Sequence, residues 1–341
     1  MAEKATIVTV ARRAQVSRQT VSNVLNTPHL VRAETKDRVL RAIEELGYRA
    51  NLAARQMRTG RSRLIAIRVE PTQDGISGSV NDRFLHALTE AGAPAGYRVL
   101  LYSATDAETE IAAYDDLLAA YELDGFVLLD TYRGDVRTSW LTERGVPFVT
   151  FGRPWGAPDD HPWVDVDGAA GTAAATRRLI EAGHERIGFL GWLPDNDLGE
   201  DRRAGWDREL RAAGLDHAGL GTATANTIEA GESGAHDLLR RPQPPTALVC
   251  ASDSLAFGAL QATRDAAIAV IGFDDTPVAR AVGLTSVAQP MAEAATCCMT
   301  LLAQLLDHTP TTVDNDRTPI TVDNNPAHVL LAPTLMVRRS G

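Results

Sequence analysis

The sequence is poor in residues that would mark a secreted or a metal-binding protein. Its 341 residues include three cysteines, Cys250, Cys297 and Cys298, whose spacing matches no common set of metal ligands. We expect the adjacent pair to pack in a core or on a helix face rather than to form a disulfide. No apolar run approaches the roughly 18 residues of a membrane span, and the first residues lack a charged-then-apolar secretion signal. We therefore expect a cytoplasmic protein of two or three domains.

The sequence also lacks the short motifs of several common enzyme classes. It contains no G-x-S-x-G, no P-loop, no complete dinucleotide-binding fingerprint and no H-E-x-x-H. We accordingly expect no enzymatic activity, no cofactor and no bound metal.

Charge is distributed very unevenly along the chain. The formal net charge of −10 is unfavourable for binding nucleic acid. However, residues 1–63 contain 13 lysines and arginines against 5 acidic residues, and the remainder contains 21 against 39. A basic head can bind phosphates locally while an acidic body is repelled by them. The distribution predicts that contact with DNA is confined to the head.

Apolar residues at helical spacing predict two short helices within residues 6–26. Ser17 follows a turn at Val16 and is placed to cap the second helix. This arrangement is typical of a helix-turn-helix that enters the major groove, although any small helical bundle can contain two such helices. The inner faces would consist of Ile7, Val10, Ala11, Ala14, Val21, Val24 and Leu25.

The outward face of the second predicted helix carries side chains that suit DNA. Long or forked donors read base edges in a major groove, and we expect Arg18, Gln19 and Asn23 to do so. Shorter hydroxyl and amide side chains are placed for phosphate contacts, which position a protein without specifying a sequence. The candidates for phosphate contact are Thr6, Ser17, Thr20, Ser22, Asn26 and Thr35.

Two further segments complete the N-terminal region, residues 1–50 and 51–61. RAETKDRVLRAIEELG predicts a third helix that ends at Gly47. The basic segment that follows is too short to form a stable helix alone. We therefore expect residues 51–61 to be a hinge that becomes helical when two copies pack together on DNA. The apolar face of the third helix would consist of Val39, Ala42, Ile43 and Leu46.

This order of elements resembles the lactose/galactose repressor family of bacterial transcription regulators. The matching residues are T-I-x-x-V-A-x-x-A-x-V-S-x-x-T-V-S-x-V-L-N and E-T-x-x-R-V-L-x-A-I-x-E-L-G-Y-x-x-N-x-x-A-R. The resemblance implies that Asn51, Ala54 and Arg55 belong to the hinge. It also implies that Met57, where the family usually has leucine, wedges into the minor groove. The alternative is that Met57 packs only within the hinge. A homodimer on a nearly palindromic double-stranded DNA operator is a further implication.

From residue 61 onward, nearly continuous apolar strands alternate with helices. This pattern predicts parallel sheets covered on both faces, and its two series resemble the periplasmic-binding-protein-like core of the same family. We expect an N-terminal lobe of residues 62–164 plus 290–318 and a C-terminal lobe of residues 165–289 plus 319–341. An effector cleft should separate them. The fold class is thus a small all-α head followed by a two-lobed α/β core.

The sequence departs from the family pattern at two places. Only Ala266 and Ala267 separate an expected helix at 254–265 from a strand at 268–273, where the family has a longer loop. This is either a deletion or a mobile piece that the given chain lacks. The head also departs at Thr9, Gln15 and Arg32, where the family often has acidic, glycine and serine residues.

The resemblance also implies which residues bind the effector. Arg202, in DRRAGW, would donate to ligand hydroxyls or a carboxylate, and Asp274, in IGFDD, would accept from the ligand. Ser252 and Asp253 could serve this site or cap the helix that they begin. Trp163 could stack on a sugar ring or pack within a lobe. Further candidates are Phe84, Arg153, Trp155 and Gln289.

Carboxylates, an arginine and one or two tryptophans describe a carbohydrate site better than a purine site. We therefore expect a repressor of carbohydrate-use genes whose small-molecule effector is a sugar, longer than a monosaccharide and of the cellobiose type. Two alternatives are a corepressor-dependent regulator that responds to a purine or phosphosugar, and a sugar-binding protein without a regulatory role. Paired carboxylates also serve glycosidases, but a hinged two-lobe cleft favours binding.

Overall fold

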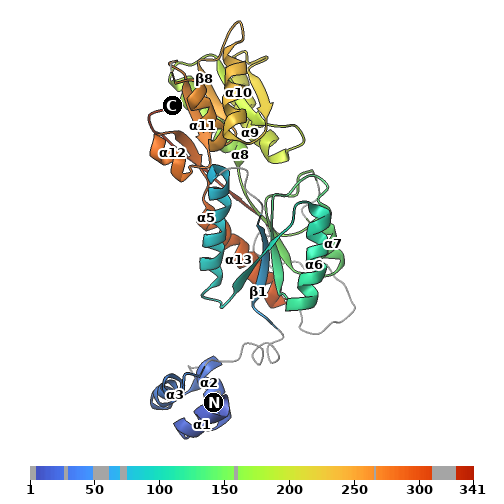
Figure 1. Ribbon diagram of the computed structural model, residues 1–341, viewed down its shortest axis with the longest axis vertical. Coiled ribbons are helices and arrows are strands. Elements are labelled where there is room, and N and C mark those ends of the chain that lie inside the picture. The colour runs from blue at the N-terminus through green and yellow to red at the C-terminus, as the bar shows by residue number, and fades with distance from the viewer. Residues whose placement is uncertain are drawn as a thin grey trace. The chain divides into compact units, whose positions relative to one another are not determined.

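The computed structural model describes residues 5–26, 30–48, 61–69, 75–156, 160–264, 266–308 and 328–341. They belong to two units, Met1–Ser62 and Arg63–Gly341 (Figure 1). Among the described residues, no helix combines the length and apolar character of a membrane span. Several predicted DNA-contacting and hinge positions lie outside the described residues: Asn51, Ala54, Arg55, Met57 and the side chain of Asn26.

The described residues of the head form three helices: α1 (Ile7–Ala14), α2 (Arg18–Asn26) and α3 (Ala33–Leu46). Their apolar faces enclose one small core, as the spacing predicted. Leu25 and Leu46 were predicted to face inward, but each is 37% exposed. These two residues lie at the ends of their helices, beyond the reach of so small a core. The buried members are Val10, Ala11, Ala14, Val21, Val24, Val39 and Ala42.

Hydroxyl side chains begin the first two helices. The Thr6 hydroxyl accepts from the backbone N–H of Thr9, and the Thr9 hydroxyl accepts from that of Thr6. This reciprocal pair is a capping box, so Thr9 fills the place of an acidic residue. Ser17 begins α2 as predicted, because its hydroxyl accepts from the N–H of Thr20 at 3.0 Å.

The other two departures in the head have a local cost. Gln15 ends α1 with a φ of 53°, a conformation that favours glycine. Arg32 occupies the N-cap position of α3 and makes no capping hydrogen bond with its side chain. A serine at such a position typically adds about 1 kcal/mol. By contrast, α3 ends as predicted at Gly47, whose φ is 59°.

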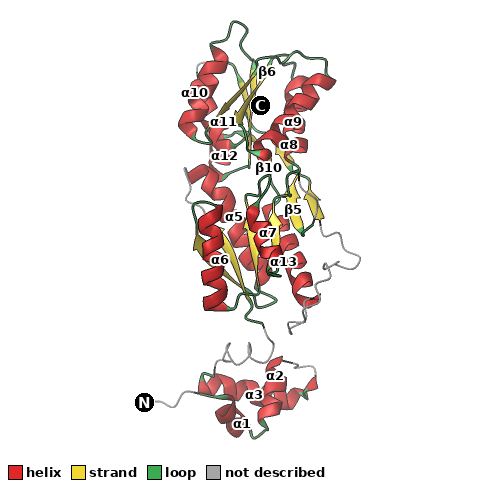
Figure 2. Ribbon diagram, turned by 90° about the vertical axis from the view of Figure 1, so that its right-hand side faces the viewer, coloured by secondary structure: helices red, strands yellow, loops and turns green. Residues whose placement is uncertain are grey.

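The described residues of the second unit form two six-stranded sheets, each in its own lobe (Figure 2). The N-terminal lobe has the strand order β11-β5-β4-β3-β1-β2, and all its described pairings are parallel. Its strands are β1 (Leu64–Val69), β2 (Arg98–Ser103), β3 (Gly125–Leu129), β4 (Phe148–Phe151), β5 (Trp163–Val166) and β11 (His328–Leu331). Its helices are α5 (Gly75–Gly92), α6 (Ala107–Tyr121), α7 (Val136–Glu143) and α13 (Met291–His308).

The C-terminal lobe has the order β12-β10-β9-β8-β6-β7, in which only the described pair β10–β12 is antiparallel. Its strands are β6 (Ile187–Trp192), β7 (Gly221–Thr224), β8 (Ala247–Cys250), β9 (Ala269–Phe273), β10 (Thr285–Ala288) and β12 (Thr334–Met336). Its helices are α8 (Gly168–Glu181), α9 (Asp197–Ala212), α10 (Ile228–Leu239), α11 (Asp253–Ala262) and α12 (Pro277–Val282).

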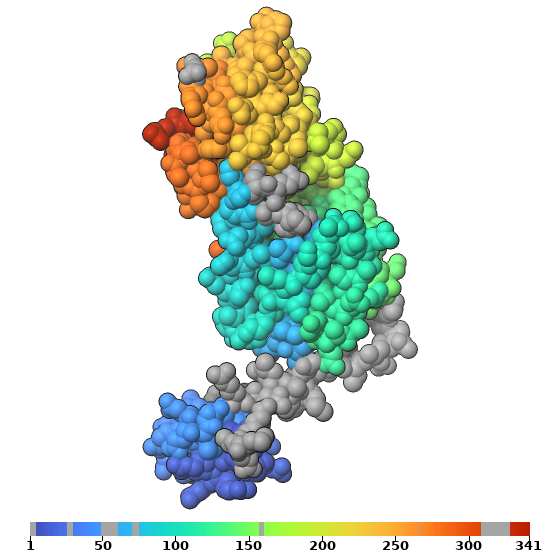
Figure 3. Space-filling view, viewed as in Figure 1, coloured from blue at the N-terminus to red at the C-terminus, as the bar shows by residue number. Residues whose placement is uncertain are grey.

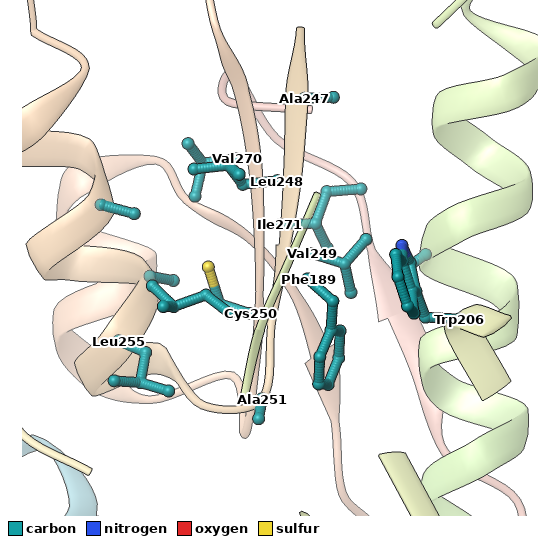
Figure 4. Packing of buried hydrophobic residues seen from close by; sticks show 14 of the residues in the cluster. Phe189, Trp206, Ala247, Leu248, Val249, Cys250, Ala251, Leu255, Val270 and Ile271 are labelled. Atoms are coloured by element: carbon teal, nitrogen blue, oxygen red, sulfur yellow. The ribbon is translucent and has the colours of Figure 1, made fainter. Parts of the chain in front are cut away.

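The central strands of each sheet are buried on both faces, which explains why β3, β4, β8 and β9 are almost entirely apolar. In the N-terminal lobe, one face packs on α5 and α13 and the other on α6 and α7. In the C-terminal lobe, Trp206 of α9 stacks on Phe189 of β6 at 5.5 Å between ring centroids, and Leu255 of α11 lies on the opposite side (Figure 4). The core therefore fixes the strand ends, where ligands bind in such folds.

The chain crosses between the lobes later than predicted at two points. β5 stays in the N-terminal sheet, so the first crossover follows Val166 rather than residue 164. β11 also pairs in that sheet, with β5, before β12 joins the other one. The assignment of all of 319–341 to the C-terminal lobe was therefore wrong for β11. The expected helix at 254–265 also ends earlier, at Ala262, which lengthens the connection to β9.

Candidate functional site

The first half of α2 presents polar side chains to solvent. Arg18 and Gln19 are exposed and Asn23 is half-buried. The Gln19 amide nitrogen donates to the Asn23 side-chain oxygen at 3.0 Å, one turn further along the helix. Side chains of this kind match the donor and acceptor pattern of base edges. The structure thus brings the predicted base-reading residues of α2 together on one surface.

Four of the six candidates for phosphate contact, Thr6, Ser17, Thr20 and Thr35, lie at helix N-termini. Thr6 and Ser17 cap α1 and α2, and the Thr20 hydroxyl lies 2.9 Å from that of Ser17. Thr35 lies in the first turn of α3, and Ser22 is half-buried in α2. Helix N-termini present free N–H groups that favour anions such as phosphate. Their contact with DNA stays a prediction.

A cleft of about 690 Å³ lies between the two lobes of the core. Its walls are the first half of α5, the loops after β3 and β4, and the loops after β6, β7 and β9. All of these loops follow the carboxyl ends of parallel strands, where such sheets place their ligands. Of the predicted effector residues, the described lining includes Arg202, Asp274, Trp155 and Gln289.

Arg202 forms the buried centre of the cleft. It is 3% exposed, and its Nη1 lies 3.6 Å from Oδ1 of Asp274 and donates to the carbonyl oxygen of Ala251 at 2.5 Å. Its guanidinium lies over the rings of Phe273 and Trp192, at 3.7 and 4.9 Å from their centroids. Its Nε is buried without a hydrogen-bond partner among the described residues. A ligand oxygen or a water would stabilise that donor.

Asp274 has a second partner in the cleft, because the Gln289 side-chain nitrogen donates to its Oδ1 at 2.7 Å. Burial raises the pKa of Asp274 to about 6, although the positive charge of Arg202 opposes this rise. A carboxyl group in this state lies close to its titration point at neutral pH. It can accept from a hydroxyl when ionised and donate to one when protonated.

Asp253 is next to Asp274 but is not among the described residues that line the cleft, so its contact with the effector stays a prediction. It is 1% exposed and accepts from the backbone N–H of Thr276 at 2.7 Å and from the Ser286 hydroxyl at 2.6 Å. Burial and the nearby charge of Asp274 raise the pKa of Asp253 to about 7. The two carboxyls therefore titrate as a pair.

Two aromatic candidates also lie outside the cleft. Trp163 stacks on His328, with 5.2 Å between the ring centroids and 12° between the rings, so its packing alternative holds. Phe84 is 1% exposed and stacks at 4.6 Å on Phe151, which does line the cleft. Phe84 belongs to the core between α5 and the N-terminal sheet, whereas Trp163 packs at the edge of that sheet on β11.

Ser252 and Arg153 support the lining rather than form it. The Ser252 hydroxyl caps α11 and donates at 2.5 Å to the side-chain oxygen of Asn226, which lines the cleft. The Arg153 guanidinium lies 4.6 Å from the ring centroid of Trp155, and its Nε is 2.6 Å from Asp165. Each side chain holds a lining residue in place.

Trp192 is a lining residue that the sequence reasoning missed. It ends β6, and its indole nitrogen is buried without a partner among the described residues. Its ring packs so closely on the first turn of α9 that a Cβ on Gly199 would lie 3.1 Å from it. Its place at the carboxyl end of an apolar strand was the available signal. The other missed residues of the lining include Asn81, Asp130, Tyr132, Asp165, Asp197 and Asn226.

The lining carries much more negative than positive charge. Its described members include five carboxylates and a single guanidinium, that of Arg202. Three of the carboxylates are paired with arginines from just outside the lining, Asp130 with Arg68, Asp165 with Arg153 and Asp197 with Arg133. Such a cleft favours neutral polyhydroxylated ligands, whose hydroxyls donate to carboxylates and whose rings stack on indoles.

Comparison with known proteins assigns both units of the chain. Residues 6–51 match the family of bacterial regulatory proteins, lacI family, and residues 176–340 match a periplasmic binding protein-like domain. The HTH-type transcriptional regulator CelR of Thermobifida fusca is 33% identical, with 98% of each chain covered. The chain belongs to the lacI family. It is a DNA-binding transcriptional regulator that responds to an effector, as predicted.

Other lacI-family members support the same assignment. The regulator AglR of Rhizobium meliloti is 36% identical over 75% of this chain and 72% of its own length. A solved complex of the regulator CelR with cellobiose is 30% identical, covers 99% of this chain and 100% of its own, and has a TM-score of 0.71. A lacI-family regulatory protein from Chloroflexus aggregans is 32% identical, with a TM-score of 0.73 and coverage of 82% and 98%. The predicted fold class is confirmed.

Proposed function

We propose that this regulator is a repressor of carbohydrate-use genes, that it binds a palindromic operator as a homodimer, and that a disaccharide of the cellobiose type releases it. The observation that carries the proposal is the composition of the interlobe cleft. There, the Arg202–Asp274 pair lies beside Gln289 and shares one lining with Trp155 and Trp192. The complex of the relative CelR with cellobiose supports this class of ligand.

The size and shape of the cleft support a ligand of more than one ring. Its volume of about 690 Å³ lies well within the range of small-molecule sites. Trp192 belongs to the C-terminal lobe and Trp155 to the loop between β4 and β5 of the other lobe. An indole from each lobe offers each of two sugar rings its own apolar surface.

The charge of the cleft argues against the purine and phosphosugar alternative. A phosphate would enter a lining with five carboxylates and one guanidinium, and the like charges would repel it in a low-dielectric site. Four of these carboxylates have arginine or amide partners, among them Asp165 with Arg153 and Asp274 with Gln289. Groups that already have partners suit binding better than general acid and base catalysis, so we propose that the protein is not an enzyme. We also propose that it needs no cofactor and acts in the cytoplasm.

Release would follow from movement between the lobes. A sugar that contacts both lobes favours one arrangement of them and thereby shifts the spacing of the two heads in a dimer. Such coupling between two ligands is typically about 1–3 kcal/mol, or roughly 5–150-fold in affinity. By linkage, operator DNA then weakens sugar binding by the same factor.

The test is operator binding by the full chain, measured by fluorescence anisotropy. A palindromic duplex is first selected from random-sequence DNA, and binding is then repeated across a panel of mono- and disaccharides. We expect tight binding at low salt that cellobiose or a related disaccharide weakens. Absence of specific DNA binding would overturn the repressor assignment. Release by a purine or phosphosugar alone would overturn the sugar assignment.

A further inference from the structure

Helix α5 of the N-terminal lobe also contacts the C-terminal lobe. Its first half lines the cleft through residues that include Ser77 and Asn81. The same helix packs against α11 and α12 of the C-terminal lobe, and its surface meets that of the α12 region (Figure 1, Figure 3). A change in lobe orientation must therefore alter the contacts of α5.

Arg83, in the middle of α5, makes the polar part of this contact. Its Nη1 donates to the backbone carbonyl of Asp274 at 3.0 Å and to that of Asp275 at 3.3 Å. Its Nη2 donates to the carbonyl of Gln289 at 3.5 Å. The guanidinium does not line the cleft, but two of the residues that it holds do, Asp274 and Gln289. It therefore supports the effector site from behind.

The loop that Arg83 holds has an unusual backbone. Asp274 has a φ of 111° and Asp275 a φ of 47°, so two consecutive residues with side chains lie in the region that favours glycine. Such conformations persist only when surrounding contacts fix them. Asp275 is braced within its own lobe, by Arg280 at 2.9 Å and Arg338 at 2.5 Å. The hydrogen bonds from Arg83 add a brace from the opposite lobe.

A second polar contact between the lobes is of a different kind. The Arg133 guanidinium lies 2.9 Å from Asp197. Asp197 lines the cleft, whereas Arg133 lies outside the lining and its side chain is 67% exposed. Asp197 is only 15% exposed and also accepts from the Arg133 backbone N–H at 2.9 Å, but the guanidinium of this pair faces solvent, where ion pairs contribute little. Arg83 is half-buried and binds main-chain carbonyls, whose positions follow the fold of the C-terminal lobe. It is thus the better candidate for transmitting a shift of the effector residues.

We propose that Arg83 is a positioning residue of the effector site, which acts from the N-terminal lobe to hold the Asp274–Asp275 loop and Gln289 of the C-terminal lobe. This proposal rests on the proposed function for its ligand. Arg83 sets the positions of two effector residues and also the resting orientation of the lobes. Sugar binding at Asp274 and Gln289 then moves α5 through the same three hydrogen bonds.

The decisive experiment measures the distance between the lobes in the full chain. Spin labels are placed at the exposed Ala120 of α6 and Ser233 of α10, after Cys297→Ser removes the only described cysteine that is not fully buried. Pulsed dipolar spectroscopy then records the distance distribution without sugar. Arg83→Met removes the donors but keeps much of the side-chain volume. Arg83→Lys keeps the charge with fewer donors, and His86→Ala, on an exposed part of α5, is the matched control.

We expect a broader or shifted distribution for Arg83→Met, an intermediate one for Arg83→Lys, and no change for His86→Ala. A distribution in Arg83→Met identical to that of the parent overturns the proposal, whether or not any sugar binds. If Arg83→Met does not fold, Arg83→Lys decides: a broader distribution supports the proposal and an unchanged one overturns it. This result does not depend on the identity of the effector.

Titration with cellobiose provides the second readout. We expect Arg83→Met to bind cellobiose about tenfold more weakly, because hydrogen bonds from a charged donor no longer fix Asp274 and Gln289. The change in distance on adding cellobiose should also shrink. If neither cellobiose nor another disaccharide shifts the distances in the parent protein, the proposed function fails while the role of Arg83 in lobe orientation is still decided by the sugar-free data.

Discussion

The N-terminal lobe buries one cluster of charged side chains, and the C-terminal lobe buries another beside the cleft. In the first cluster, the Glu110 carboxylate is 0% exposed and is held by four side chains, through hydrogen bonds or ion pairs. They are the hydroxyls of Tyr102 at 3.0 Å and Tyr114 at 2.8 Å, and the guanidinium groups of Arg137 at 2.9 Å and Arg68 at 3.2 Å. Burial raises the pKa of both tyrosines, so they stay neutral donors.

The second cluster holds more acidic than basic groups, whereas in the first the buried Glu110 and Asp135 face two guanidinium groups, with Asp135 2.7 Å from Arg137. Two carboxyls, Asp253 and Asp274, share a single buried cation, Arg202, at 3.6 Å from the nearer one. Burial raises the pKa of Asp253 to about 7 and that of Asp274 to about 6, and burial lowers the pKa of Arg202. The charges in this cluster are thus only partly compensated within the protein.

The difference separates a structural cluster from a functional one. Buried ions are tolerated when partners and hydrogen bonds offset their desolvation, as at Glu110. The second cluster has two carboxyls for one cation, and its Arg202 Nε, next to the cleft, has no hydrogen-bond partner among the described residues, so this cluster can still bind a ligand. The first cluster should therefore matter for stability, and the second for effector response.

The largest effect on stability should come from Glu110→Gln. The amide removes the carboxylate that Arg68 and Arg137 share, while Arg137 keeps Asp135 at 2.7 Å and Arg68 keeps Asp130 at 3.6 Å. Removing one partner from a buried ion pair costs up to about 3–5 kcal/mol, and the remaining partners should hold the loss near the lower end of that range. Urea unfolding followed by circular dichroism would measure this loss. The exposed Glu108, on the same helix, offers the control Glu108→Gln, which should change stability by less than about 0.5 kcal/mol. Equal effects of the two variants would contradict the structural role of the cluster.

The second effect is a pH dependence that belongs to the other cluster. Folded pKa values of about 6 and 7, raised above the ordinary aspartate value of 3.8, mean that folding favours the protonated carboxyls. Their stabilising contribution is complete below about pH 4 and is lost as the pH rises through 6 and 7. At about 1.4 kcal/mol per pKa unit, the loss is on the order of 3–4 kcal/mol for each carboxyl.

This dependence can be isolated by comparing the parent with Asp274→Asn in urea at pH 4, 5.5 and 7. The parent should lose stability relative to the variant as the pH rises, because the variant lacks one of the two coupled carboxyls. Parallel stability curves for the two proteins would show that these carboxyls titrate normally. Parallel curves would also mean that the buried charge clusters of the two lobes do not differ in how fully their charges are compensated.

A third, smaller effect should follow from Tyr102→Phe. Glu110 would keep its two guanidinium partners and the Tyr114 hydroxyl, so the loss is that of one hydrogen bond, about 1 kcal/mol. Packing of the ring edge on Tyr114 and Phe126 would persist. Denaturation by urea checks the value, and a loss as large as that of Glu110→Gln would mean that the Tyr102 hydroxyl contributes far more to the cluster than one hydrogen bond.

The two clusters also show what could be predicted from the sequence. Apolar periodicity located the three helices of the head and most of the alternating strands, because burial of one face imposes that spacing. The family motifs led to Arg202 and Asp274. They also led to Trp163, whose packing on His328 depends on β11. A partner more than a hundred residues away leaves no trace in local spacing, and the same is true of the late crossovers.

The cluster around Glu110 was missed for a similar reason, although a signal existed. Arg68 interrupts the apolar strand LIAIRV, and a charge inside a buried strand requires a partner. Which residue supplies that partner depends on how β1, α6 and α7 pack, since Glu110 and Arg137 come from separate helices. Arg83 was missed because it binds main-chain carbonyls, and a contact of that kind has no sequence pattern on the accepting side.

The smallest effect on stability, and the largest on function, should come from Asp274→Asn at neutral pH. The variant loses the ion pair with Arg202, but it also removes a buried carboxylate whose ionised form is disfavoured. These changes oppose each other, so we expect stability within about 1 kcal/mol of the parent. Operator binding should be unchanged, while cellobiose should no longer weaken it, because the amide replaces the strongest acceptor in the cleft.

Anisotropy titrations with and without cellobiose measure this response, and Asp116→Asn, on the exposed side of α6, should retain it. A stable Asp274→Asn protein that still responds would show that the partly compensated cluster is structural after all, and that the two lobes bury charge for the same purpose.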